Sequence, residues 1–198
     1  MKRLFPVLAL CALALPSASS GQSFEAWLGG GASMLSNNGI GSLAGVVGTP
    51  NDVQLKGGFR INFRMAINMG SRMGHELGYA YNRTQLAETG SADQGMAIHQ
   101  GFYDFLYYGT KEGARVRPFA AGGVQFSNFV PPGTSATQGG GNTKFGFNYG
   151  AGVKMRLTSR FGIRFDFRQY ATGKPFGLPL ASGWLRQNEI SGSFGFLL

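Results

Sequence analysis

Hydrophobic and polar residues alternate over one long stretch of the chain, LKGGFRINFRMAINM at residues 55–69. Its odd positions are mostly apolar, whereas its even positions include Lys56, Arg60 and Arg64. A period of two places the two sets on opposite faces of a β-strand. Ordinary strands have about 5–6 residues, whereas a tilted strand that crosses a bilayer needs roughly 9–11. The length of this stretch therefore favours a membrane-spanning strand.

The same alternation recurs along the chain and predicts eight strands, at residues 23–34, 55–69, 73–87, 96–108, 115–130, 143–157, 160–172 and 188–198. The connections between them alternate between short turns, such as 70–72 and 158–159, and longer loops, such as 35–54 and 173–187. Bacterial outer-membrane barrels have short periplasmic turns and longer external loops. The pattern thus predicts an all-β protein, a single eight-stranded antiparallel up-and-down transmembrane β-barrel.

The first residues have the layout of a secretory signal peptide. Lys2 and Arg3 precede an apolar stretch at residues 4–15, and small residues follow. The stretch is too short for a membrane-spanning helix and contains Pro6. We therefore expect a cleaved signal peptide at 1–20, a barrel domain at 21–198, and export to the outer membrane of a bacterium with two membranes. Cleavage removes Cys11, the only cysteine, so no disulfide is expected.

The cost of placing charge in lipid decides which face points outward. A Lys or Arg side chain near the bilayer middle costs about 2–4 kcal/mol, so Lys56, Arg60 and Arg64 are expected to point inward. The strand at 96–108 is apolar in both phases, and Gln100 and Asp104 are assigned to its inner face.

A soluble lipocalin-like barrel would have the opposite arrangement, with the apolar face inside and the charged face in water. Glycines on the polar face argue against that alternative, because a narrow lumen needs small residues; they are Gly74, Gly78, Gly146, Gly150, Gly152, Gly162 and Gly195.

Charged residues inside a narrow barrel need partners of opposite charge. The inward phase predicts a charge network in the lumen that would plug the barrel and prevent conduction. Its expected members are Glu25, Arg60, Arg64, Glu76, Asp104, Arg117, Arg164, Asp166 and Arg168, and Glu189 is a further acid in the inward phase.

Several stretches carry a resemblance to a known family: HELGYAYNRT, RPFAAGGVQFSNF, FNYGAGVKMRLTSRFGIRFDFRQY and the closing ISGSFGFLL. With the signal peptide and the loop pattern, the chain resembles small eight-stranded outer-membrane β-barrel proteins of the OmpA/OmpX and opacity-porin type. The resemblance implies that the barrel-insertion machinery reads an assembly signal in the last strand. Ile190, Gly192, Phe194 and Phe196 match its alternating face, and Leu198 stands where the family usually has an aromatic residue.

Candidate residues for chemistry are few. His75 and Glu76 are adjacent and therefore point to opposite faces of a strand, so they cannot cooperate directly. His75 is expected at the membrane interface, and the sequence identifies no partner for His99. Two histidines, without a mature cysteine or a cluster of carboxylates, do not predict a metal site. The glycine-rich stretches lack P-loop spacing. We expect no catalysis, no cofactor and no metal.

Partners follow from charge and location. Without Lys2 and Arg3 the formal net charge falls from +9 to +7, and in an exported protein anionic lipid headgroups are expected partners, whereas nucleic acid is not.

The loop at 173–187 has an apolar core that could be adhesive or could fold over the barrel mouth: Phe176, Leu178, Leu180, Trp184 and Leu185. The function hypothesis is a monomeric barrel with a structural role or an extracellular ligand at its loops. The alternatives are a narrow channel for small solutes, a lipid-modifying enzyme and a soluble lipid binder.

Overall fold

The computed structural model describes residues 22–42, 52–136 and 140–198. The expected signal peptide at 1–20 lies outside these residues. The strands of the described part are β1 (Gln22–Ser36), β2 (Gly39–Gly41), β3 (Val53–Met69), β4 (Met73–Glu88), β5 (Gln94–Tyr108), β6 (Val116–Val130), β7 (Asn142–Arg156), β8 (Phe161–Gly173) and β9 (Trp184–Leu197). A search of the same residues for a long apolar helix that could span a membrane finds none.

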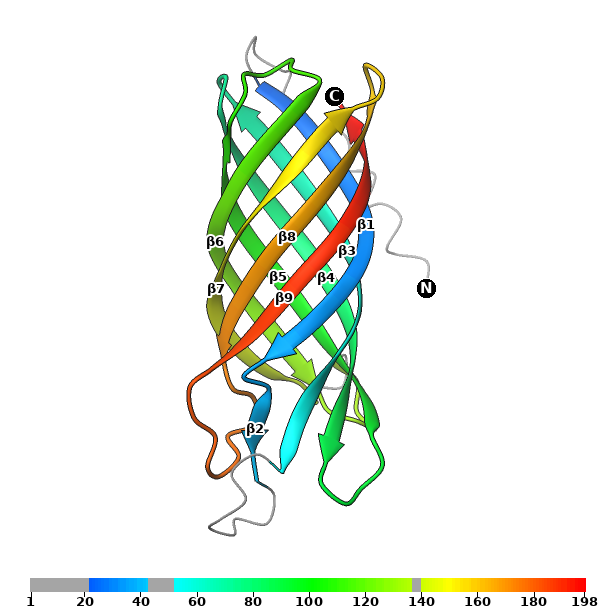
Figure 1. Cartoon of the computed structure of the whole chain (residues 1–198), viewed down its shortest axis with the longest axis vertical. Coiled ribbons are helices and arrows are strands. Elements are labelled where there is room, and N and C mark those ends of the chain that lie inside the picture. Colours follow the sequence, from blue (N-terminus) through cyan, green and yellow to red (C-terminus); the bar gives the residue numbers. More distant parts are fainter. Residues whose placement is uncertain (1–21, 43–51, 137–139) are drawn as a thin grey trace, which may run out of the picture.

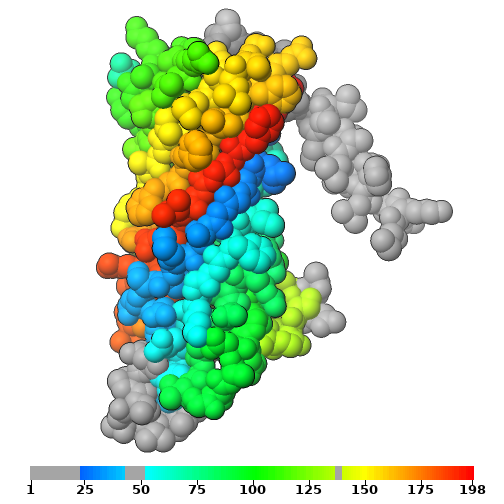
Figure 2. Space-filling view, turned by 45° about the vertical axis from the view of Figure 1, so that its right-hand side comes forward, coloured from blue at the N-terminus to red at the C-terminus, as the bar shows by residue number. Residues whose placement is uncertain are grey.

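The eight long strands close into an antiparallel barrel. Each pairs with its neighbour in the order β1, β9, β8, β7, β6, β5, β4, β3, and β1 also pairs with β3, which closes the ring. Figure 2 shows β1 in blue lying between red β9 and cyan β3. Short turns lie at one end of the barrel, and the longer loops with β2 lie at the other (Figure 1). The predicted all-β, eight-stranded fold is confirmed.

The outer surface of the barrel is apolar over most of its height. Along β3, for example, Phe63 and Ile67 are exposed while Arg64 and Asn68 are buried. The same holds for β5, where Tyr103, Phe105 and Tyr107 are exposed and Gln100 and Asp104 are buried, as the sequence predicts. A water-soluble barrel would place these aromatic rings inside. The outer surface is therefore the lipid-facing surface of a transmembrane barrel.

One inward assignment on β3 is wrong. The pairing of β3 with β4 shifts register between Lys56 and Phe59, which marks a β-bulge at Gly57 and Gly58. The alternation reverses there: Leu55 is fully buried, whereas Lys56 points outward and forms an ion pair with Asp93 at 2.5 Å. Glycine permits the bulge, because a Cβ atom on Gly58 would overlap the carbonyl oxygen of Arg83.

The strand boundaries agree with the sequence within a few residues. The largest difference is in the last strand, which begins at Trp184 instead of residue 188 and shortens the preceding loop. The short strand β2 lies within the predicted loop at 35–54 and pairs with the start of β3.

Glycines on the inner face make room mainly for aromatic rings. A Cβ atom on Gly78 would overlap the ring of Phe102, and one on Gly195 would overlap the indole of Trp27. An arginine occupies part of this room at Gly150, where a Cβ atom would lie 2.7 Å from Cδ of Arg168.

We expect Gly78→Ala to lower the free energy of unfolding by about 1–3 kcal/mol, because overpacking displaces the ring of Phe102. Adding Phe102→Leu should restore part of the loss. The matched control is Gly192→Ala on the lipid face, where the added Cβ would lie 3.5 Å from the nearest atom of Phe165. Urea unfolding in lipid vesicles, followed by tryptophan fluorescence, measures all three variants. Equal stability of the two single variants would contradict the packing argument.

Candidate functional site in the barrel interior

The interior of the barrel is filled in layers along its axis. From the short-turn end to the long-loop end these are a layer around Glu25 and Lys154, a central charge network, a layer of amides and hydroxyls, and an apolar cluster at the mouth. Each layer takes side chains from strands on opposite sides of the barrel. An eight-stranded interior has a diameter that side chains can fill.

The central network joins four arginines to four acids, all with fully buried side chains. Ion pairs link Arg60 and Arg64 to Glu189 at 3.0 and 2.7 Å, Arg164 to Asp166 at 2.7 Å and to Glu76, and Arg168 to Glu76 at 3.0 Å, to Asp166 at 3.2 Å and to Asp104. Because each carboxylate accepts from more than one donor, the desolvation of these charges is offset by several interactions.

Strand periodicity explains how the network assembles. Arg164, Asp166 and Arg168 are two residues apart on β8, so their side chains leave the same face. Glu76 and Asp104 are directly paired across β4 and β5. Two like charges in such a pair repel one another, and Arg168 reaches across the lumen to contact both.

Next toward the long loops lies a neutral layer of amide and hydroxyl groups. The amide nitrogen of Gln100 donates to Ser127 at 2.9 Å and to Gln187 at 2.8 Å, and Gln187 donates to Ser33 at 2.5 Å and Asn82 at 2.9 Å. These bonds join β1, β4, β5, β6 and β9 across the lumen. Arg60 also donates to Gln100 and Asn82, which connects this layer to the charge network.

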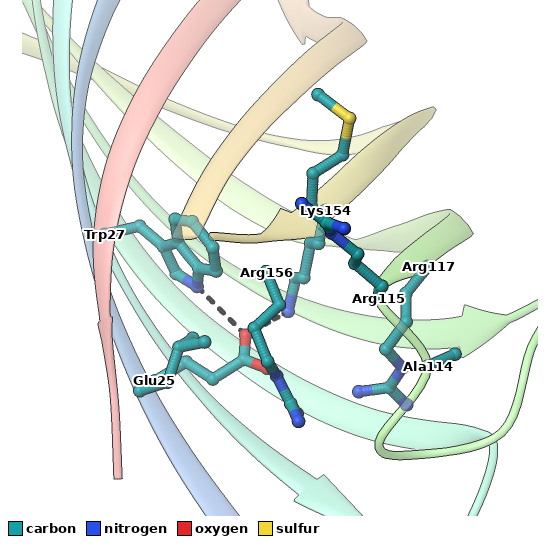
Figure 3. Close-up of a pocket in the computed structure, with 9 residues that line it drawn as sticks. Glu25, Trp27, Ala114, Arg115, Arg117, Lys154 and Arg156 are labelled. Carbon is teal, nitrogen blue, oxygen red and sulfur yellow. Dashed lines mark hydrogen bonds and ion pairs between the residues drawn. The ribbon is translucent and has the colours of Figure 1, made fainter. Parts of the chain in front are cut away.

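A second charged centre lies at the short-turn end (Figure 3). The carboxylate of Glu25 accepts from Lys154, from Nε1 of Trp27 at 2.9 Å and from Asn68 at 2.8 Å. Lys154 also donates to the hydroxyl of Tyr108 at 2.6 Å. Lys154 is buried on the inner face of β7, but the sequence did not identify it as the partner of Glu25.

The predicted network residues divide into two groups. Eight of them take part in buried ion pairs: Glu25, Arg60, Arg64, Glu76, Asp104, Arg164, Asp166 and Arg168. The expectation that Arg117 also pairs with an acid is wrong. Its guanidinium Cζ lies 3.7 Å from the ring centroid of Tyr108, and the described residues show no ion pair between Arg117 and an acid. The reason is its place on β6 near the short turns, where Glu25 is already bound by Lys154.

An apolar cluster closes the mouth at the long-loop end. Its buried members are Ile40, Val53, Leu55, Met96, Ile98, Phe129 and Leu185, and Phe176 and Leu178 pack against them. The loops are tied together above it, since the backbone N–H of Ser42 donates to the carbonyl of Pro179 at 3.0 Å. The apolar part of the last loop is therefore divided: Phe176, Leu178 and Leu185 fold over the mouth, whereas Leu180 and Trp184 are exposed.

Both histidines lie on the outer surface and contact tyrosines. His75 Nδ1 is 2.5 Å from the hydroxyl of Tyr103, and His99 Nδ1 is 2.5 Å from that of Tyr79. The cross-strand partner of His99 was not identifiable from the sequence, because it depends on the register of β4 and β5. Within the described ranges no group of three or more possible ligands could hold a metal ion.

We expect Glu76→Gln to lower the free energy of unfolding by about 3–5 kcal/mol, because it leaves buried Arg164 and Arg168 short of negative charge. Glu88→Gln, at the other end of the same strand, is the matched control and should change stability little. Urea unfolding in vesicles of one lipid composition compares the two. A loss at Glu76 no larger than that at Glu88 would show that the network does not stabilise the barrel.

Comparison with known proteins agrees with this architecture. Ail of Yersinia pestis, crystallised with the heparin analogue sucrose octasulfate, superposes with a TM-score of 0.53 at 13% identity, covering 91% of this chain and 100% of that chain. Neisserial surface protein A superposes with a TM-score of 0.56 at 13% identity, covering 91% of this chain and 99% of that chain. OprG of Pseudomonas aeruginosa superposes with a TM-score of 0.55 at 12% identity, covering 92% of this chain and 98% of that chain. At such identities the likeness shows the fold alone.

No curated protein matches the sequence significantly. The family model for the outer membrane protein beta-barrel domain, however, matches residues 5–196, nearly the whole chain. Together with the apolar outer surface and the closed strand order, this match identifies the chain as a member of the outer membrane protein beta-barrel domain family, located in the outer membrane of Gram-negative bacteria.

Proposed function

We propose that this protein is a closed, non-conducting and non-enzymatic barrel that presents a recognition surface at its long-loop end. The observation that carries the proposal is the filled interior, in which an apolar cluster around Ile40 and Leu55 lies above a buried network of ion pairs. A hydrated ion would have to displace both layers to cross. Long loops of such barrels face the outside of the cell, so this end is available to extracellular partners.

A hollow on the rim of this end supports recognition. It has a volume of about 520 Å³ and is lined by Ser36, Asn37, Gly183, Trp184 and Arg186. Trp184 is half exposed, and its ring lies 5.5 Å from that of Phe147. Trp and Arg are the residues most enriched at binding hot spots. An exposed indole beside a guanidinium suits a ring-shaped ligand that carries negative charge.

An anionic polysaccharide is the ligand class that we propose for this hollow. The long-loop end carries five cations, Lys56, Arg83, Lys144, Lys174 and Arg186, against three acids, Asp52, Glu88 and Asp93. The structurally similar Ail was crystallised with sucrose octasulfate, a sulfated disaccharide and an analogue of heparin, which is an anionic polysaccharide. A purely structural role in the envelope is the competing function.

The proposal also includes recognition of the last strand by the barrel-insertion machinery during assembly. Ile190, Phe194, Phe196 and Leu198 are exposed on the lipid face of the barrel's closing edge, and Gly192 lies in phase with them. This apolar face is the feature that supports recognition of the last strand by the barrel-insertion machinery.

In planar lipid bilayers we expect the purified protein to give no reproducible stepwise current, because the apolar cluster and the buried ion pairs lie across the lumen. A general porin inserted under the same conditions is the positive control, and heat-dependent mobility on an SDS gel verifies that the barrel is folded. Uniform conductance steps from the folded protein would favour the narrow-channel alternative.

Binding of sucrose octasulfate to intact cells that display the protein tests recognition. We expect Arg186→Gln and Trp184→Ala each to weaken binding severalfold, because they remove the charge and the stacking surface of the hollow. Lys111→Gln, in a turn at the opposite end of the barrel, removes the same charge and should leave binding unchanged. If cells that display the protein bind no more sucrose octasulfate than cells that lack it, the recognition proposal is wrong and the structural role in the envelope is favoured.

A further inference from the structure

Positive charge is concentrated at the short-turn end of the barrel. The turns and strand ends there carry five cations, Arg72, Lys111, Arg115, Arg156 and Arg160, against one acid, Glu112. The hydroxyl of Ser23 donates to Glu112 at 2.5 Å. This end faces the periplasm, at the level of the headgroups of the inner leaflet. The excess charge therefore meets a surface that can contain anionic phosphates.

A small pocket opens within this cationic end (Figure 3). Its volume is about 20 Å³, and Arg115, Arg117, Lys154 and Arg156 line it together with Glu25 and Trp27. Glu25 and Trp27 project from β1, and the cationic side chains reach in from the β6 and β7 side. Arg115 is exposed and Arg156 half-buried, so the pocket opens to the rim. Its size admits one or two oxygen atoms of a larger group.

Arg117 gives the pocket a buried cation that forms no ion pair with any acid in the described ranges. Only 5% of the residue is exposed, and its Nε is a buried donor that contacts no acceptor among the described residues. Its guanidinium stacks on Tyr108, and the one side-chain hydrogen bond that it makes within the described part of the chain, to the carbonyl of Ser71, is long at 3.5 Å. Stacking fixes the orientation of the group. Burying a charged donor without a strong acceptor is costly, so an anion in this pocket would be stabilised.

Glu25 does not neutralise the arginines. Its two carboxylate oxygens already accept from Lys154, Trp27 and Asn68. One acid and one lysine thus balance each other, which leaves three guanidinium groups around the opening. Guanidinium groups bind phosphate oxygens through paired, charge-assisted hydrogen bonds.

We propose that this periplasmic pocket binds a phosphate group, with Arg117 as the buried anchor and Arg115 and Arg156 as the outer contacts. The group can belong to the headgroup of an anionic phospholipid of the inner leaflet or to free phosphate. In either case one or two phosphoryl oxygens enter the pocket and the rest of the ligand stays at the rim.

The test compares two double variants of the full chain. Arg115→Gln with Arg156→Gln removes two cations from the pocket, and Arg72→Gln with Arg160→Gln removes two cations from the same rim outside it. One arm counts the lipids retained in native mass spectrometry after release from nanodiscs of phosphatidylcholine with a minor share of phosphatidylglycerol. The second arm titrates the protein in neutral detergent with inorganic phosphate at constant ionic strength. Heat-dependent gel mobility verifies the folding of each variant.

We expect saturable binding in at least one arm, weakened roughly tenfold or more by the pocket variant and little changed by the rim variant. Phosphatidylglycerol retention alone identifies the lipid headgroup as the source, and phosphate binding alone identifies the free anion. Equal weakening in the two double variants would overturn the proposal, because it would show diffuse attraction to a basic rim. Absence of binding in both arms by the folded protein would overturn it as well.

Discussion

The structure depends on the mutual neutralisation of charges that the barrel wall shields from water and lipid. Five acids and five cations pair in the lumen, and β1, β3, β4, β5, β7, β8 and β9 each supply at least one of them. Removing water from an unpaired charge costs several kcal/mol, so none of these seven strands can leave the ring without exposing its partners on the others to that cost. Closure of the sheet and pairing of the charges are therefore one cooperative event. The glycines that accept Phe102 and Trp27 serve this arrangement, because they let large rings fill the space between the ion pairs.

Much of the barrel architecture could be predicted from the sequence, because apolar residues alternate with polar ones where one face of a strand contacts lipid and the other faces the lumen. The eight strands, the lipid-facing rings and the inward arginines all follow from a period of two and from the cost of charge in lipid. Pairing is different, since it depends on register. Neither the contact of Lys154 with Glu25 nor that of His99 with Tyr79 has a signal in the spacing of residues along one strand. Arg117 shows the same limit, because its phase was correct while its partner turned out to be an aromatic ring.

The two ends of the barrel are closed by different physical means. At the long-loop end, apolar side chains from six barrel strands, from β2 and from a loop exclude water and hold the loops together. At the short-turn end, Glu25 and Lys154 fill the lumen with a hydrogen-bonded pair that has arginines around it. Salt screens exposed charges much more than buried ones, so ionic strength acts mainly on the arginines at the rim of the short-turn end and little on the buried pair or on the apolar cluster. The outward end is thus suited to a constant loop framework, and the periplasmic end to interaction with charged groups nearby.

The bulge at Gly57 and Gly58 separates two segments of one strand that follow opposite rules. On the short-turn side of it, arginines point inward and rings point outward, as in a protein dissolved in lipid. Beyond it, Leu55 and Val53 point inward and Lys56 points outward, as in a protein dissolved in water. The reversal therefore separates a part of β3 whose outer face carries apolar side chains from a part whose outer face carries Lys56.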